Sequence, residues 1–401
     1  MTEGTNQGLF VVVAIVIFGL FIFLVYFLFG DTLTPALSST FKDATENVMG
    51  ILNNGTQSGE DIADDEWLKD LEDKEYVVAE DADFTGDVDG EFRYVGDDVK
   101  VIIPNVIKGV TITSVKEMFS NNTQVEAVAI NNPNVTDMSY MFYNNQSTSL
   151  DVSNLVTENV ENMEGMFYES KAESLDLSSF DTSKVANMSY MFLGSPATIL
   201  DLSNWNTSNV TNIANMFYNS KAESLDLSSF DTSKVMDMKF MFAGSQAISI
   251  NISSFDTSNV TDMSGMFDRS QATSLDLSSF DTSNVTNMSH MFKESKAESL
   301  DLSGFDTSNV TDMSWMFYYS LANSINSSSF DTSKVTNMLY MFAGSQANSL
   351  DLSSFDTSNV TDMSSMFYNS QATTAYARTE SDADKFNNSS NKPSTLTFVV
   401  K

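Results

Sequence analysis

One hydrophobic pattern recurs along most of this chain with a period of 25 residues. Each copy contains a Met-Phe pair, and from Met141 to Met366 these pairs follow one another at constant spacing. A fixed period of this size is typical of a solenoid, in which each turn covers the apolar face of its neighbour. We therefore predict that the copies stack into one array with a continuous dry interior.

Two shorter periods within each copy predict the elements of one turn. Leu175 and Leu177 alternate with Ser and Asp, which predicts a short parallel strand with its leucines inward. Inward positions of the next segment follow helical spacing, at Val185, Met188, Met191 and Phe192. A Thr or Ser of the preceding "DTS" is expected to cap that helix. The predicted fold is an α/β solenoid, a leucine-rich-repeat-like stack with 25-residue turns, each a short parallel strand plus a short helix.

The N-terminal region has a different pattern. Residues 9–29, "LFVVVAIVIFGLFIFLVYFLF", are apolar and uncharged over a length that spans a bilayer, so residues 1–30 are predicted to be a transmembrane anchor. Residues 31–55 have one apolar stripe at helical spacing and predict a juxtamembrane amphipathic helix. This helix lies on the bilayer or continues the span. Alternatively, it is a seam through which several copies of the chain associate, and a pilin-like assembly is a further alternative.

The remaining boundaries follow changes in composition. Residues 56–91 are rich in Asp and Glu and predict an acidic linker. Its stretch "DADFTGDVDGEF" imitates a calcium loop, but Phe92 stands where such a loop requires a bidentate Glu, so we expect an acidic turn. We predict irregular entry repeats at 92–148, nine 25-residue repeats at 149–373 and a C-terminal cap at 374–401.

Composition removes several functional classes. The formal charge of −34 disfavours nucleic acid, whose phosphates it repels. The chain has no Cys, which excludes disulfides and thiolate chemistry, and it has a single His, His290. Its many carboxylates recur identically from copy to copy, whereas catalysis normally needs one site unlike its surroundings. We expect no enzyme and no cofactor.

Two sets of outward positions are candidate partner-binding surfaces. One outward strand position is mostly Asp, and its candidates are Asp176, Asp201, Asp226, Asp276 and Asp301. These carboxylates form either a hydrated solubilising ladder or a surface for a basic partner or a loosely bound divalent cation. An outward position before the Met-Phe pair often carries an aromatic residue, and its candidates are Tyr140, Tyr190, Phe240, Trp315 and Tyr340. Such side chains either anchor a partner or pack on adjacent turns.

The repeat "LDLSSFDTSNVTDMSSMF" resembles that of the BspA-like leucine-rich-repeat surface proteins of bacteria. The segments "YVGDDVKVIIPNVIKGVTITSV" and "AYARTESDADKFNNSSNKPSTLTFVVK" resemble the entry repeat and the closing cap of that group. This resemblance implies a surface-exposed solenoid used for adhesion, without catalytic residues. It does not imply a particular ligand.

The sequence thus predicts a single-pass protein of the cell membrane whose repeat domain is extracellular. Its solenoid is expected to mediate adhesion or protein–protein interaction with a protein or glycan ligand on host matrix or on other cells. The alternative is a structural or assembly protein, a homo-oligomer joined through its N-terminal helices.

Overall fold

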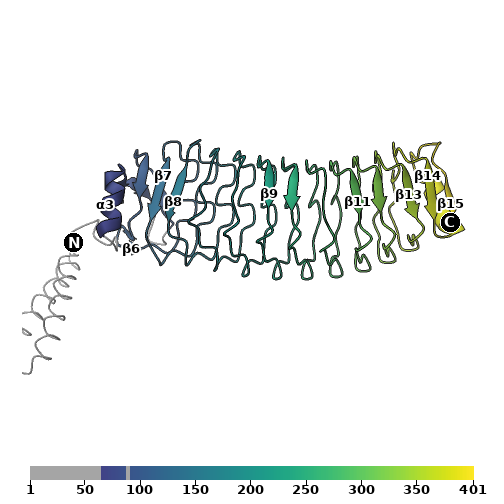
Figure 1. Ribbon diagram of the computed structural model, residues 1–401, viewed down its shortest axis with the longest axis horizontal. Coiled ribbons are helices and arrows are strands. Elements are labelled where there is room, and N and C mark those ends of the chain that lie inside the picture. Colours follow the sequence, from purple (N-terminus) through teal and green to yellow (C-terminus); the bar gives the residue numbers. More distant parts are fainter. Residues whose placement is uncertain (1–64, 87–90) are drawn as a thin grey trace, which may run out of the picture. The chain divides into compact units, whose positions relative to one another are not determined.

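The computed structural model describes residues 65–86 and 91–401, all within the compact unit Asp61–Lys401. These residues wind into a β-solenoid of about 13 turns, which Figure 1 shows as a row of similar coils. The solenoid prediction is confirmed in this form.

The regular elements are short. The helices are α3 (Asp65–Asp73), the 3-10 helix η1 (Asp81–Asp83) and α4 (Glu380–Asn387). The first strands are β1 (Val77–Val78), β2 (Phe84–Thr85), β3 (Arg93–Tyr94), β4 (Lys100–Ile102), β5 (Val106–Ile107), β6 (Val110–Thr111), β7 (Ala127–Ile130) and β8 (Asp151–Leu155). The later strands are β9 (Ser224–Asp226), β10 (Ser249–Asn251), β11 (Ser299–Asp301), β12 (Ser324–Asn326), β13 (Ser349–Leu352), β14 (Thr374–Ala377) and β15 (Phe398–Val400).

The strands pair in parallel with the register of the repeat. Ser224 of β9 lies opposite Ser249 of β10, so one turn of the solenoid takes 25 residues. At the N-terminal end the sheet order is β1-β4-β7-β8, and at the C-terminal end it is β13-β14-β15. The predicted strand is therefore confirmed in most turns, with its leucines buried at positions such as Leu225 and Leu300. Residues 174–178 and 274–278 form only an isolated bridge, and residues 199–203 form no strand, although their leucines face inward as predicted.

The predicted helix in each turn is wrong. No helix lies between residues 113 and 373, and this side of the turn is a run of tight turns. The N–H of Phe192 donates to the carbonyl of Met216 in the next turn at 2.9 Å, while Met191 N–H reaches back only to Met188, at 3.3 Å. A segment this short is a marginal helix on its own. Bonds to the neighbouring turn satisfy its backbone instead, and tight turns of three residues place the same side chains inward.

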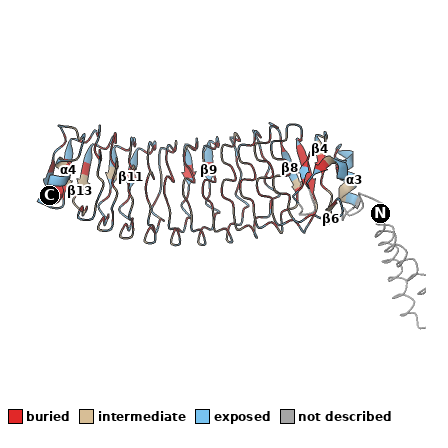
Figure 2. Cartoon of the chain, turned by 180° about the vertical axis from the view of Figure 1, so that it is seen from behind, coloured by how far each residue is buried: buried red, intermediate tan, exposed pale blue. Residues whose placement is uncertain are grey.

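Buried phenylalanines form a continuous column through the solenoid. The Phe of each Met-Phe pair stacks on the next, from Phe119 to Phe367, with ring centroids 5.1–6.1 Å apart and interplanar angles of 2–17°. The Met residues beside them are fully buried, as predicted, and fill the space between identical layers. Figure 2 shows the buried residues along the inside of the coils.

A buried threonine ladder runs beside this core. Thr182 was expected to cap a helix, but its hydroxyl donates to the carbonyl of Asn206 at 3.0 Å and accepts the N–H of Asn206 at 2.9 Å. The same pair of bonds joins Thr232 to Asp256 in a later turn. The hydroxyl thus satisfies the backbone at the corner where no strand forms.

Both ends of the described solenoid are closed by aromatic side chains. Tyr94 of β3 lies 5.5 Å from Phe119, tilted by 43° across the first ring of the column. Phe386 of α4 meets Phe367 edge-on at 5.7 Å, and Phe398 of β15 lies 4.8 Å from the same ring. A stacked array needs terminal turns of this kind, because they cover the apolar face that the last repeat would otherwise expose to water.

Part of the predicted acidic linker is folded. Within residues 56–91, α3 packs through Leu71 against the outward face of the entry sheet, and β1 pairs with β4. Leu71 and Tyr76 form the apolar anchor that composition alone did not reveal. No helix in the described ranges is long and apolar enough to cross a membrane. The predicted span at 9–29 and the amphipathic helix at 31–55 lie outside those ranges.

Candidate binding face

The aromatic candidates occupy a strained backbone position. Tyr140, Tyr190, Phe240, Trp315 and Tyr340 have φ between 51° and 61°, in the left-handed region. Other turns place Gly, Asn or Ser at the same position, for example Gly165, Asn215, Gly265 and Ser365. Gly and Asn adopt this conformation at low cost, whereas a bulky side chain does not. The alternation of Gly and Asn with aromatics was the sequence signal for a left-handed residue, and hence against a helix.

The structure gathers four of the five aromatic candidates into two groups, while Phe240 meets only Tyr218, edge-on at 6.5 Å. The N-terminal aromatic cluster consists of Tyr140, Tyr143, Tyr168 and Tyr190, with centroid separations of 5.0–6.4 Å. Tyr140 lies over Gly165, where a Cβ atom would come within 2.4 Å of its ring, and donates its hydroxyl to Glu164 at 2.7 Å. Burial, followed by this hydrogen bond, raises the pKa of Tyr140.

A second group, the C-terminal aromatic patch, is larger and more open. It consists of Trp315, Tyr318, Tyr319, Tyr340 and Tyr368. The Trp315 ring is stacked between His290, at 5.8 Å, and Tyr340, at 4.4 Å. Tyr319 is 38% exposed and Tyr368 is 43% exposed. The patch therefore presents ring edges and hydroxyls rather than one open ring face.

Between the two groups lies an ionic cluster that the sequence interpretation missed. Asp268, with a side chain only 4% exposed, accepts from Arg269 at 3.2 Å and lies 3.8 Å from the ammonium of Lys293. Burial, and then Lys293, lower the pKa of His290 nearby. One feature of the sequence could have indicated this cluster: Asp268 stands at a position that several other turns fill with Tyr, such as Tyr218. The Asp268 carboxylate is paired with Arg269 and Lys293 within the cluster, and none of these three side chains is placed as a nucleophile.

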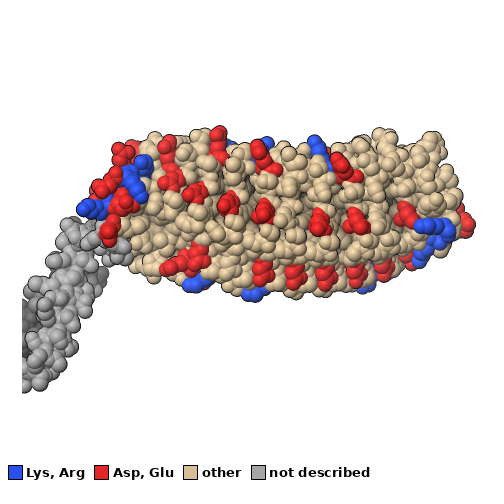
Figure 3. Space-filling model, viewed as in Figure 1, with Lys and Arg blue, Asp and Glu red and all other residues tan. Residues whose placement is uncertain are grey.

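The aspartate candidates lie on the side of the turn that carries the strands, in a different row from the aromatic candidates. Asp176 accepts the hydroxyl of Ser178 at 2.6 Å and its N–H at 3.1 Å, and these bonds lower the pKa of Asp176. Asp201, Asp226, Asp276 and Asp301 accept from the Ser two residues on in the same way. Figure 3 shows rows of carboxylates along the solenoid.

This geometry gives the aspartate row a structural role. Each carboxylate fixes the turn that follows its strand. Asn251 and Asn326 interrupt the row, and each donates to the aspartate of the preceding turn at 2.9 Å. Within the described ranges, no group of three or more His, Asp or Glu side chains is placed to hold a metal ion.

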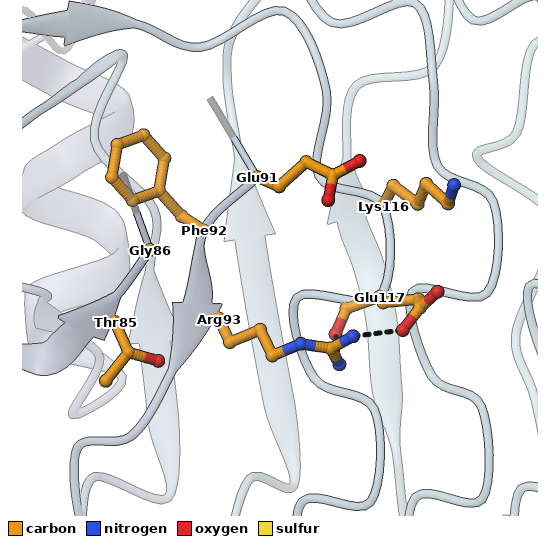
Figure 4. A pocket seen from close by; sticks show the side chains of 7 residues that line it. All are labelled: Thr85, Gly86, Glu91, Phe92, Arg93, Lys116 and Glu117. Carbon is orange, nitrogen blue, oxygen red and sulfur yellow. Dashed lines mark hydrogen bonds and ion pairs between the residues drawn. The ribbon is translucent and has the colours of Figure 1, made fainter. Parts of the chain in front are cut away.

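A small pocket lies near the N-terminal end. It has a volume of about 150 Å³ and is lined by Thr85, Gly86, Glu91, Phe92, Arg93, Lys116 and Glu117. Figure 4 shows the Arg93 guanidinium paired with the Glu117 carboxylate on one side of the pocket. This ion pair engages two of the four charged side chains that line the pocket, and Glu91 and Lys116 are the other two. Residues 87–90, beside the pocket, are outside the described ranges.

Comparison with known families places the repeat region. Residues 113–228, 221–326 and 295–395 each match one family model, described as "Mycoplasma protein of unknown function, DUF285". Together these segments cover well over half of the chain, including both aromatic groups and the ionic cluster. No curated protein and no solved structure matches the chain.

Proposed function

Because the chain belongs to the DUF285 family and its described part is a β-solenoid, we propose that it is a membrane-anchored surface protein whose solenoid mediates adhesion or protein–protein interaction. The left-handed aromatic positions carry this proposal. These side chains are half-buried, and bulky residues held in a strained conformation at such a partly open site indicate a role in contact.

Three further features support a binding role. The solenoid has a long exposed surface in proportion to its mass, which is the form that repeat proteins use for extended contacts. Its aromatic side carries Tyr and Trp, the side chains most often found at the centre of protein interfaces. The resemblance to BspA-like surface proteins and the apolar run at 9–29 support a location at the cell surface. The recurrence of the carboxylates supports a role without catalysis.

A binding screen tests the proposal. The full chain, held in nanodiscs, is applied to host-matrix proteins, to whole bacterial and animal cells, and to a glycan array. We expect saturable binding to at least one of these, with a dissociation constant in the micromolar range or below. Absence of binding to all three by protein with an intact β-sheet circular dichroism spectrum would contradict it.

The assembly function remains the second candidate, supported by the apolar stripe at Leu37, Phe41, Ala44, Val48 and Leu52. Here the N-terminal helices join copies of the chain, and the solenoid decorates the assembly. A discrete oligomer in light scattering, becoming monomeric when residues 1–55 are removed, would favour this function over adhesion.

A further inference from the structure

The C-terminal aromatic patch differs from the N-terminal aromatic cluster in its exposure. Tyr319 and Tyr368 are 38% and 43% exposed, whereas all four tyrosines of the N-terminal cluster are half-buried. In the patch, the hydroxyls of Tyr318 and Tyr340 make no hydrogen bond within residues 65–86 and 91–401. Their polar tips therefore face water or a partner.

The patch is also maintained at a cost in backbone strain. Trp315, Tyr319 and Tyr340 have φ of 60°, 48° and 55°. The left-handed backbone is disfavoured for side chains of this size, a strain that Asn or Gly would largely avoid. At the positions of Trp315 and Tyr319, the turn that holds Asn215 uses Asn in both places, Asn215 and Asn219. The fold thus tolerates Asn there, and packing alone does not require the aromatics.

The charge near the patch indicates the kind of partner. Residues 301–377 contain seven Asp and no Glu against one basic residue, Lys334, but Asp301 and Asp351 lie on the strand side, away from the aromatics. The ammonium of Lys334 is bonded to Asn309, and Lys293 beside the patch is near Asp268 and Glu294. Glu294 lies close enough to Tyr318 to contribute, after burial and Tyr319, to raising the pKa of that phenol. Glu294, and Asp312 beside His290, are thus the carboxylates near the patch, and the nearby cations Lys293 and Lys334 already have partners.

The aromatic geometry favours a protein over a glycan. A sugar ring stacks on an open aromatic face, but both faces of Trp315 are covered by the rings of His290 and Tyr340. The patch instead presents phenol hydroxyls and nearby carboxylates, which accept hydrogen bonds from guanidinium and ammonium groups. Arg donates several such bonds at once and is also enriched at interface centres.

We propose that the C-terminal aromatic patch is the recognition site of the solenoid and that it binds a protein segment presenting arginine or lysine side chains. This inference rests on the adhesion function proposed above and names its site and the chemistry of its partner.

The test uses the full chain in nanodiscs and an array of synthetic 12-residue peptides. The array contains arginine peptides, copies with each Arg replaced by neutral citrulline, and copies with each Arg replaced by Glu. The test variant is Trp315→Asn with Tyr340→Asn. The matched control is Tyr140→Asn with Tyr190→Asn, which removes two left-handed aromatics from the N-terminal cluster. Circular dichroism confirms that both variants are folded.

We expect the wild-type chain to bind arginine peptides at least about tenfold more tightly than their citrulline copies. The patch variant should lose about tenfold of that affinity, and the control variant should retain it. An equal loss of peptide affinity in both variants would mean that the acidic solenoid attracts cations generally, and it would overturn the proposal. Absence of binding to arginine peptides by the wild-type chain would also overturn it. Binding to a glycan array through the patch would also overturn it. Cell binding that survives in the patch variant would overturn the patch as the site but leave the adhesion function standing.

Discussion

The Phe of each Met-Phe pair is the residue on which every turn depends. Phe242 is fully buried between Phe217 and Phe267, with centroids 5.8 and 5.5 Å away. Each ring touches the layer on either side, so that removing one ring leaves a cavity bordered by two turns.

We expect Phe242→Ala to lower the free energy of unfolding by about 3–5 kcal/mol. Met236→Ala is the control, because Met236 is 55% exposed and its loss should cost less than about 0.5 kcal/mol. Urea unfolding followed by tryptophan fluorescence measures both. Similar midpoints for the two variants would contradict a dry column of phenylalanines.

Trp205 is an exception in a second buried column. It stacks between Phe180 and Phe230, but its indole N–H has no partner among the described residues. An unsatisfied buried donor costs about 1–3 kcal/mol, which offsets the larger area that the indole buries. We expect Trp205→Phe to change stability by less than about 1 kcal/mol and Trp205→Ala to cost about 3–5 kcal/mol. A thermal unfolding series measures both, and a large loss in the Phe variant would show that the indole has a specific role.

At the scale of elements, the C-terminal helix α4 closes the threonine ladder. The Asp382 carboxylate accepts the N–H of Thr357 at 3.1 Å and its hydroxyl at 2.7 Å, where other turns use a backbone carbonyl. Burial alone would raise the pKa of Asp382, but hydrogen bonds from Thr379 and Thr357 lower it to about 2. The cap thus depends on one ionised carboxylate.

The pH dependence follows from the sign of this shift. Because the folded pKa lies below the unfolded value of 3.8, Asp382 stabilises the cap above pH 3.8, and this contribution is lost as the pH falls toward about 2. We expect Asp382→Asn to cost about 2 kcal/mol at pH 7 and progressively less below pH 3.8. Asp384→Asn, at an exposed position of the same helix, is the control. Hydrogen exchange in β14 and β15 reports cap opening, and a pH-independent difference would contradict this account.

The turn length, the buried residues and the strand found in most turns could be predicted from the sequence. The backbone conformation of the segment that carries the Met-Phe pair could not be predicted. Inward residues at i, i+3, i+6 and i+7 fit a helix and a chain of three-residue turns equally well. Gly165 and Asn215 in the aromatic position distinguish the two, because a helix has no place for left-handed residues. The Asp268 cluster could not be predicted because its residues belong to two different turns. It depends on a single departure from the repeat, the Asp at position 268 where several other turns have Tyr.

At the scale of the whole solenoid, stability should depend on complete turns. Each turn contacts only its neighbours, so that removal of one full period restores the same interfaces. Deletion of residues 226–250 joins Leu225 to Asn251 and should yield a folded protein with a thermal midpoint close to wild type. Deletion of residues 226–237 breaks the register of both phenylalanine columns and should yield an unfolded or aggregated protein. Size-exclusion chromatography with circular dichroism compares them, and equal behaviour would contradict stacking in register.

The stack itself is tested most directly by distances between spin labels, since the chain has no native Cys to interfere. Thr198, Asn323 and Thr373 are exposed and occupy the same position in their turns. Asn323 lies five turns after Thr198, and Thr373 lies seven turns after it. With cysteines introduced in pairs, electron–electron double resonance should give ~24 Å for Thr198→Cys with Asn323→Cys and ~34 Å for Thr198→Cys with Thr373→Cys, following the rung spacing of parallel strands. Distances that do not increase by ~10 Å between the two pairs, or that are broadly distributed, would contradict a solenoid of stacked 25-residue turns.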